Sequence, residues 1–213
     1  YQNYYKKMRK LLTFKKVETE DELNEAYKLR FKVYCQERDF EPETAFPEQI
    51  EIDEYDAYSI HFIAKIGLET VGTLRLILDN PNGFPIEKCC RLNGYDKRLK
   101  KDKTAEFSRF AISKEIVKST GSDRREIVLG LFRQAYQESK NLGINYFYAV
   151  MARGLQKLLN KCGVIFIQVG PLIDYHGLRA PYVSGIKAIE ESMFMKNIDL
   201  FRFITAPAIC QYA

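Results

Sequence analysis

The alternation of hydrophobic and polar positions divides the first third of the chain into a helix, a loop and a hairpin. Thr19 and Glu22 have the spacing of a capping box, and apolar and aromatic positions then recur at helical spacing. Two prolines and several acids predict a loop over 41–56. The runs SIHFIAKI (59–66) and VGTLRLIL (71–78) are separated by GLET, which predicts an antiparallel hairpin.

Strands and helices alternate in the rest of the chain. The predicted elements are strands over 105–113, 144–151 and 164–170, helices over 124–141, 154–163 and about 187–200, and a proline-bounded turn at GLRAPYV (177–183). An antiparallel hairpin followed by a β-α-β-α order predicts an α/β fold. Its sheet should be mixed, with helices on the faces.

The composition is that of an ordinary globular protein. The 213 residues are 46% hydrophobic and 29% charged, so we expect a single domain over 1–213 with a sizeable core. No apolar run approaches the ~18 residues of a membrane helix, and no signal-peptide pattern opens the chain. The five cysteines have no regular spacing, which favours reduced thiols in a cytoplasm. The chain begins at Tyr1 rather than Met, so some N-terminal sequence is expected to be missing.

The charge is spread unevenly although the net charge is only +5. Residues 1–16 carry six positive charges and no negative one, whereas residues 41–56 carry seven acids and no Lys or Arg. We therefore treat 1–18 as a basic N-terminal segment. Such a segment favours an acidic partner, namely nucleic acid, an anionic membrane surface or an acidic protein, and a solvated helix end is an equally good alternative.

The sequence lacks the usual motifs for a metal site and for a nucleotide-binding site. The chain has only two histidines, His61 and His176, each far in sequence from a plausible metal partner, so we expect no metal site. Neither G-x-G-x-x-G nor G-x-x-x-x-G-K-[ST] occurs, which disfavours a dinucleotide fold and a phosphate-binding P-loop.

Three arginines occupy positions where a charge needs a partner. Arg30 lies on the core-facing stripe of the first predicted helix, and Arg75 and Arg109 lie within predicted strands. A buried guanidinium needs an anionic or hydrogen-bonding partner. The stretch EIDEYD (51–56) and Glu106 supply carboxylates. Structural salt bridges and a catalytic site are both open, and one does not exclude the other.

Glu106 and Arg109 raise a geometric requirement. Residues three positions apart in a regular strand point to opposite faces of the sheet. A β-bulge would turn both side chains to one side and would free backbone N–H groups for a ligand. If both residues serve one site, the strand over 105–113 should therefore be interrupted.

The order of these residues resembles that in the acyl-homoserine-lactone (autoinducer) synthase family, and LRFKVYCQERDF is also similar to N-acyl amino acid synthases and exosortase-associated acyltransferases. The matching residues are Arg30, Tyr34 and Phe40, then Glu51, Asp53 and Asp56, then Arg75 in GTLRLI, then Glu106 and Arg109 in EFSRFAI. The resemblance covers about 19 to 170. It implies a GNAT-like three-layer α/β/α domain with a mixed, partly splayed central sheet.

The resemblance also implies a reaction. Such enzymes move a fatty acyl group from the phosphopantetheine thioester of acyl carrier protein to the amine of an amino acid or of S-adenosylmethionine, in autoinducer synthases for quorum sensing. We expect no permanently bound cofactor, the acyl-phosphopantetheine donor being a substrate on acyl carrier protein or coenzyme A. The expected partners are acyl carrier protein and a small-molecule amine, not nucleic acid. The family positions usually filled by Trp and Phe are Phe40 and Tyr34 here, which leaves the amine open.

By the same resemblance each matched residue has an expected role. The catalytic network beside the amine would comprise Glu51, Asp53, Asp56, Arg75, Glu106 and Arg109. Arg30, Tyr34 and Phe40 would order a lid formed by 19–56. The other expected substrate-binding residues are Phe107, Ser108, Arg124, Arg125 and Met151.

The chemistry explains why carboxylates are needed. An α-amine has a pKa of about 8 or higher and must lose a proton before it attacks a thioester. A carboxylate can attract the ammonium and accept that proton, and we expect Glu51, or in second place Glu106, to be this general base. A backbone N–H within 105–109 would stabilise the oxyanion, which is worth roughly 3 kcal/mol.

Basic residues are candidates for binding the acyl donor and its carrier protein. The helix N-terminus after VKSTGSDRR (117–125), with Arg124 or Arg125, has the elements to hold one phosphate, as in carrier-bound pantetheine. The N-terminal segment or DKRLKKDK (96–103) would dock the acidic carrier protein. Two other function classes stay open: a coenzyme A-dependent GNAT acetyltransferase, and a non-catalytic module that binds nucleic acid or membrane through residues 1–16.

Overall fold

The computed structural model describes residues 12–95 and 99–207. Contacts divide the chain into two compact units, which we describe one at a time. Among the described residues, the first unit holds 12–53, 61–75 and 109–134, and the second holds 54–60, 76–95, 99–108 and 135–207. Residues 1–11, 96–98 and Cys210 lie outside the described part, and with them most of the basic N-terminal segment. The expectation of a single domain stays a prediction.

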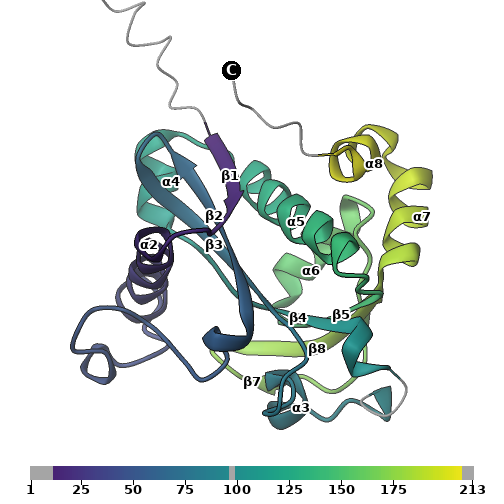
Figure 1. Ribbon diagram of the computed structural model, residues 1–213, viewed down its shortest axis with the longest axis horizontal. Helices are drawn as coiled ribbons and strands as arrows, with labels where there is room; N and C mark the ends of the chain where they lie inside the picture. Colours follow the sequence, from purple (N-terminus) through teal and green to yellow (C-terminus); the bar gives the residue numbers. More distant parts are fainter. Residues whose placement is uncertain (1–11, 96–98, 208–213) are drawn as a thin grey trace, which may run out of the picture. The chain divides into compact units, whose positions relative to one another are not determined.

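Figure 1 shows the elements along the chain. The strands are β1 (Leu12–Lys16), β2 (Ser59–Ile66), β3 (Glu69–Ile77), β4 (Thr104–Ile112), β5 (Tyr146–Met151), β6 (Ile167–Gln168), β7 (Ile173–Asp174) and β8 (Leu178–Gly185). The α-helices are α2 (Glu20–Phe31), α3 (Pro85–Cys89), α4 (Lys114–Thr120), α5 (Arg124–Asn141), α6 (Arg153–Lys161), α7 (Ile186–Lys196) and α8 (Ile198–Thr205). The short helices are η1 (Lys32–Gln36), η2 (Glu43–Ala45), η3 (Asp56–Tyr58) and η5 (Lys101–Lys103).

The strands form a mixed sheet in the hydrogen-bonded order β1-β2-β3-β4-β5-β8-β6, with β7 paired to β8 off this path. β1 and β2 are antiparallel, β4 and β5 are parallel, and β5 and β8 are antiparallel. The mixed α/β fold predicted from the sequence is therefore confirmed.

Helices cover both faces of the sheet in the first unit. On one face, Glu25 of α2 accepts hydrogen bonds from Lys65 Nζ (3.0 Å) and Thr70 Oγ1 (2.5 Å). On the other, Phe14 of β1 packs so closely on α5 that a Cβ on Gly130 would lie 2.2 Å from its ring. Phe14 is paired with Ala64, next to Lys65, so Phe14 and Lys65 point to opposite faces. This unit has the three layers expected of the fold.

Strand β1 was not predicted, because its two lysines were counted with the basic segment over 1–18. Leu12 and Phe14 alternate with polar residues, as a strand edge requires. The flanking charge is neutralised locally, since Lys15 Nζ lies 2.7 Å from Glu22 Oε1. The end of the basic segment is therefore part of the sheet.

Helix α2 begins where the capping pattern predicts. Thr19 Oγ1 accepts a hydrogen bond from the N–H of Glu22 (3.3 Å), and Glu22 Oε2 accepts one from the N–H of Glu18 (3.0 Å). At its other end α2 continues into η1, a five-residue π-helix with a wider turn. The carbonyl of Tyr34 in η1 accepts hydrogen bonds from the N–H groups of Phe40 and Glu41.

The core of the second unit lies on both faces of its part of the sheet. Tyr148 of β5 and its partner Val183 of β8 pack with Phe84, which precedes α3, and with Ile86 of α3. On the opposite face, the rings of Phe107 and Phe147 are 4.4 Å apart. The β4–β5 pairs end at Phe107 and Ala149, although both strands continue. An early end of this ladder is the local feature expected of a partly splayed sheet.

Two sequence predictions for the C-terminal part were wrong. The segment predicted as a turn is strand β8. Pro181 is tolerated in this strand although it has no N–H group. Its carbonyl accepts a hydrogen bond from the N–H of Val169, just beyond the two-residue pairing with β6. An N–H at position 181 would point to the same side, so its absence costs no hydrogen bond of that pairing. The single helix predicted over 187–200 is two helices, α7 and α8, separated at Asn197. The predicted strand over 164–170 is reduced to β6.

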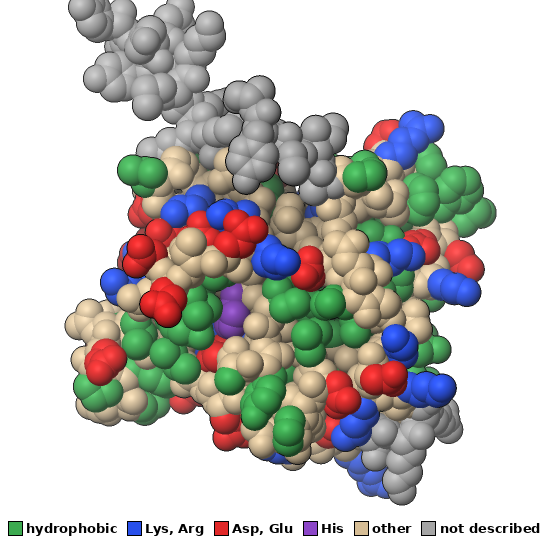
Figure 2. Space-filling view, viewed as in Figure 1, with side chains coloured by type: hydrophobic (Ala, Val, Ile, Leu, Met, Phe, Trp, Pro, Cys, Tyr) green, Lys and Arg blue, Asp and Glu red, His purple; other side chains and the backbone are tan. Residues whose placement is uncertain are grey.

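Helices α7 and α8 leave apolar side chains at the surface. Figure 2 shows hydrophobic side chains exposed over these helices, where Phe194, Met195 and Phe203 lie. Within the described part of the chain, no helix is long and apolar enough to cross a membrane.

Candidate active site

The last turn of α2 buries an arginine against the acidic loop. Arg30 is 0% exposed, and its Nε donates a hydrogen bond to Oε2 of Glu51, which is 1% exposed. The guanidinium carbon of Arg30 also lies 5.1 Å from the centre of the Tyr27 ring. The N–H of Glu51 donates to the carbonyl of Tyr27, which ties the loop to the helix. The charge expected on the core-facing side of this helix is therefore paired.

Arg109 contacts two acids of this loop, Glu51 and Asp53. Its Nε lies 2.9 Å from Glu51 Oε1, and its Nη2 lies 2.9 Å from Glu51 Oε1 and 2.9 Å from Asp53 Oδ2. Its guanidinium carbon is 5.5 Å from the centre of the Tyr34 ring, which packs on Phe40 at 5.9 Å. Arg109 has a φ of +48°, which a regular strand does not allow for a non-glycine residue. This residue lies within β4, which runs on to Ile112, and a bulge that turns Glu106 and Arg109 to one side stays a prediction.

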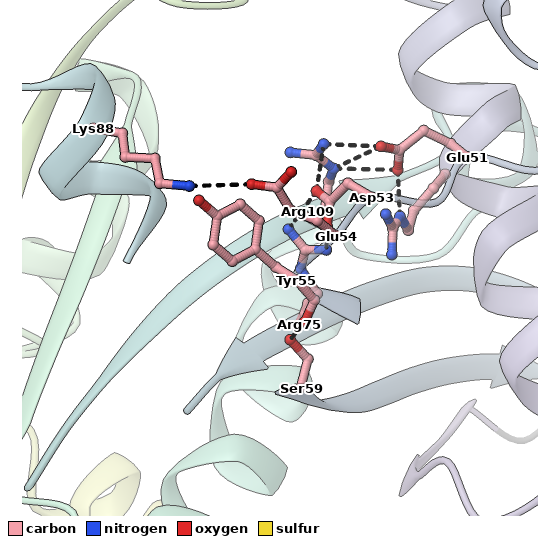
Figure 3. Close-up of polar contacts among 9 residues, drawn as sticks. Glu51, Asp53, Glu54, Tyr55, Ser59, Arg75, Lys88 and Arg109 are labelled. Carbon is pink, nitrogen blue, oxygen red and sulfur yellow. Dashed lines mark hydrogen bonds and ion pairs between the residues drawn. The ribbon is translucent and has the colours of Figure 1, made fainter. Parts of the chain in front are cut away.

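Arg75 completes the cluster. Its Nη1 and Nη2 lie 2.6 Å and 2.9 Å from the two carboxylate oxygens of Asp53, the two-pronged geometry that holds a carboxylate most strongly. We call Arg30, Glu51, Asp53, Arg75 and Arg109 the arginine–carboxylate network. Figure 3 shows the carboxylates of Glu51 and Asp53 pointing toward the guanidinium of Arg109. All five residues belong to the first unit.

The network holds the carboxylate of Glu51 in the ionised form. Burial raises the pKa of Glu51, but the charges and hydrogen bonds of Arg30 and Arg109 outweigh burial, and the net pKa lies below its ordinary value. For Arg109, burial lowers the pKa, while Glu51, Tyr34 and Asp53 raise it by more. Burial, with the charges of Glu51 and two other acids, raises the pKa of Cys35 to about 11. Cys35 is therefore a protonated, weak nucleophile, in line with a direct acyl transfer.

The expected role of Glu51 as general base fits this geometry poorly. Both oxygens of Glu51 accept hydrogen bonds from guanidinium groups, and its pKa is lowered rather than raised. A base that works near neutral pH needs a pKa close to that pH. Glu51 is better suited to holding Arg30 and Arg109 in place than to accepting a proton.

The other predicted residues of β4 and its neighbours lie in the second unit. Glu106 is 3% exposed, and its Oε2 accepts a hydrogen bond from the N–H of Ile86 in α3 (3.0 Å). Asp56 is buried at the start of η3, and Met151 is buried at the end of β5. Phe107 and Ser108 are half-buried. The catalytic role of Glu106 and Asp56 and the substrate-binding role of the other three residues stay predictions.

The predicted phosphate position at the start of α5 is occupied by the chain itself. Asp123 Oδ1 accepts a hydrogen bond from the N–H of Arg125 (2.8 Å), and Thr120 Oγ1 lies 2.9 Å from Ser122 Oγ. An acidic side chain at a helix N-terminus competes with an anion for the same N–H groups. Arg124 and Arg125 are exposed there, and phosphate binding by them stays a prediction.

Sequence reasoning missed Glu37, which fastens the end of η1 to β4 and α4. Its Oε1 accepts from Ser113 Oγ (2.5 Å) and its Oε2 from the N–H of Lys114 (2.8 Å). Nothing in the local pattern distinguishes Glu37 from a surface acid. Within residues 12–95 and 99–207, no group of three His, Cys, Asp or Glu side chains is placed to hold a metal ion.

Comparison with known proteins identifies the family of this chain. The model of the family "N-acyl amino acid synthase FeeM" matches residues 25–184, which include all five members of the network. The chain belongs to this family. The resemblance proposed from the sequence is therefore confirmed, and the protein is an N-acyltransferase of the autoinducer and N-acyl amino acid synthase type.

Individual relatives agree with this assignment. An acyl-homoserine-lactone synthase of Vibrio anguillarum is 26% identical over 139 residues, which are 64% of this chain and 70% of the relative. Two solved structures share the fold. FeeM, an N-acyl amino acid synthase from uncultured soil microbes, has a TM-score of 0.66 at 17% identity, covering 87% of this chain and 95% of that chain. BjaI, a coenzyme A-dependent acyl-homoserine lactone synthase, has a TM-score of 0.70 at 18% identity, covering 93% and 92%.

Proposed function

We propose that this protein transfers a fatty acyl group from the phosphopantetheine thioester of acyl carrier protein to the α-amine of an α-amino acid or of S-adenosylmethionine. The observation that carries the proposal is the buried arginine–carboxylate network, which lies wholly within the residues matched by the FeeM family. The two amines share an α-ammonium and an α-carboxylate, and the network has groups for both.

The charges of the network suit such a substrate. Three guanidiniums face two carboxylates, so the five side chains together carry an excess of positive charge. A substrate carboxylate would reduce that excess, and Asp53, whose side chain is 24% exposed, would attract the ammonium group. Glu51 and Arg30 are almost completely buried and act by holding Arg109.

The proton of the ammonium requires a base other than Glu51. We assign this role to Glu106, which lies three residues before Arg109 on β4 and accepts a hydrogen bond from a neutral backbone N–H. Glu106 is the second carboxylate that the family resemblance places in the catalytic network. We further propose that the left-handed backbone of Arg109 turns an N–H group of β4 toward the oxyanion of the tetrahedral intermediate.

The donor is the less constrained part of the proposal. Asp123 accepts a hydrogen bond from one N–H group at the start of α5, and its negative charge there disfavours the pyrophosphate of coenzyme A. Carrier-bound pantetheine has a single phosphate and therefore needs fewer N–H donors at this helix end. BjaI, which shares the fold, is coenzyme A-dependent, so an acyl-coenzyme A donor is the alternative that the experiment must include.

The test is an acyl transfer assay with matched donors and amines. Long-chain acyl carrier protein, the same acyl group on coenzyme A, and acetyl-coenzyme A are each offered with the standard amino acids and with S-adenosylmethionine, and products are identified by mass spectrometry. We expect N-acylated product from the carrier-protein donor at the highest kcat/KM. Preference for acetyl-coenzyme A would favour the acetyltransferase alternative, and folded protein without product from any pair would overturn the proposal.

Two variants test the assigned roles. Glu106→Gln should lower kcat at least tenfold and remove the acidic limb of the pH–rate profile, because the base is lost. Arg109→Lys keeps the charge but loses the two-pronged contact, so KM for the amine should rise at least tenfold with a smaller change in kcat. An unchanged pH profile in Glu106→Gln would remove Glu106 from the role of base.

A further inference from the structure

Two adjacent thiols in the second unit have no part in acyl transfer. Cys89 is the last residue of α3 and Cys90 follows it, and their Sγ atoms lie 3.4 Å apart. Both side chains are half-buried. We propose that Cys89 and Cys90 form a reversible modification site, a vicinal dithiol that a hydroperoxide converts into a vicinal disulfide.

The site is open to a small oxidant. Cys90 lines a cavity of about 540 Å³, whose wall also carries the side chains of Arg91 and Lys101. Burial raises the pKa of both thiols, so they rest in the protonated form. Lys101 is paired with Glu87, which also lines the cavity, so the wall offers Cys90 little net positive charge and the thiols react through a small fraction of thiolate. The geometry therefore combines slow spontaneous oxidation with access for a molecule the size of a peroxide.

The chemistry uses both sulfurs. The thiolate of Cys90 attacks one peroxide oxygen, so that an S–O bond forms, the O–O bond breaks, and the alcohol or water leaves with a proton. Cys89 Sγ then attacks the sulfenic sulfur, which forms the S–S bond and releases water. The two thiols lose two electrons, and the hydroperoxide gains them. A second thiol in contact intercepts the sulfenic acid before further oxidation.

Closure of the disulfide must change the backbone. Adjacent Cα atoms are held about 3.8 Å apart by the peptide bond, whereas disulfides usually join Cα atoms roughly 4.4–6.8 Å apart. In the reduced protein, the N–H of Cys90 donates to the carbonyl of Ile86 (3.0 Å) and closes the only turn of α3. The N–H of Ile86 in turn holds Glu106. Oxidation should therefore loosen α3 and with it the hydrogen bond to Glu106.

Mass spectrometry tests the modification without reference to activity. Reduced protein is treated with hydrogen peroxide, its free thiols are alkylated, and it is digested. The peptide that contains both cysteines should lose two hydrogen atoms and escape alkylation until dithiothreitol is added. Cys89→Ser and Cys90→Ser should each abolish the loss, while Cys162→Ser, a buried thiol elsewhere in this unit, should not. Oxygen addition to either sulfur, or full alkylation after peroxide, would overturn the proposal.

A dithiol reagent provides a second, non-oxidative test. Phenylarsine oxide bridges two neighbouring thiols, so one equivalent should bind the wild-type protein and protect both cysteines from alkylation. Each single serine variant should lose this protection, whereas Cys35→Ser should keep it. Equal protection in Cys89→Ser and in the wild type would contradict a paired site.

The effect on catalysis rests on the proposed role of Glu106, and its test is separate. Peroxide should lower acyl transfer by the wild-type protein at least tenfold, dithiothreitol should restore it, and Cys90→Ser should retain it throughout. A disulfide that forms without any change in rate would support the modification site and contradict its link to Glu106. Absence of acyl transfer by the untreated protein would count against the proposed function alone.

Discussion

Glu51 and Glu54 lie three residues apart in one acidic stretch, yet their surroundings are opposite. The Glu51 side chain is 2% exposed and touches two guanidiniums in the first unit. The Glu54 side chain is 60% exposed in the second unit and lies 3.1 Å from Lys88 Nζ, which is itself 53% exposed. Figure 3 draws both pairs. The same residue type is thus fixed by burial in one place and solvated in the other.

This difference answers why mutually repelling acids precede a strand. Glu51 and Asp53 are needed where Arg30 and Arg75 are almost completely buried and Arg109 is largely buried, because a guanidinium without a partner cannot be removed from water at tolerable cost. Glu54 needs no such partner and remains a surface charge. A run of acids in a sequence can therefore contain buried acids that pair with arginines and solvent-exposed acids side by side.

The largest expected effect comes from removing the buried acid. Glu51→Ala leaves Arg30 and Arg109 without a shared counter-charge in a dry site, and breaking a buried ion pair in this way typically costs about 3–5 kcal/mol. The free energy of unfolding should fall by that amount in urea titrations followed by circular dichroism. A loss below about 1 kcal/mol would mean that water reaches the network freely.

A smaller effect should appear as pH dependence. The folded pKa of Glu51 lies below its ordinary value of 4.5, so the ionised form is favoured in the folded state. This contribution to stability is complete above the unfolded pKa and is lost as the pH falls through the lower folded pKa. The difference in free energy of unfolding between the wild type and Glu51→Gln should therefore shrink from about pH 6 to about pH 3. A constant difference over this window would show that Glu51 is not the group that titrates.

The smallest effect is expected at the exposed pair. Glu54→Gln and Lys88→Ala should leave the urea midpoint and the acyl transfer rate unchanged, because water and salt screen the two charges. Adding moderate salt should not alter this result. If either variant loses activity, the second half of the acidic stretch belongs to the site after all.

The network could be predicted from the sequence because an arginine cannot be buried without a partner for its charge. Arg30, Arg75 and Arg109 occur among apolar neighbours, and buried guanidiniums require acids. Strand parity led us to expect a bulge near Arg109, where the backbone has a positive φ. The detailed pairing could not be predicted, since EIDEYD offers four carboxylates and only the tertiary structure selects Glu51 and Asp53. The resulting loss of basicity at Glu51 is a consequence of that pairing.

The features that the sequence analysis missed share one cause. In each case the local composition suggested one structure, and tertiary contacts impose another. Two lysines concealed β1, whose Phe14 fits against Gly130. A proline concealed β8, where it stands beyond the short ladder with β6. Glu37 resembles a solvated acid in the sequence and becomes a helix cap only when β4 and η1 meet.

The π-helix η1 makes the length of one segment a condition of function. Its wide turn accommodates one more residue than an α-helix would between Arg30 and Glu37. Deleting a single residue there would restore ordinary helical winding and change the direction in which Tyr34 points relative to Arg30. The aromatic ring would then leave the guanidinium of Arg109, although every side chain that binds or reacts was still encoded. In this protein, residue count between two anchors carries information that residue identity alone does not.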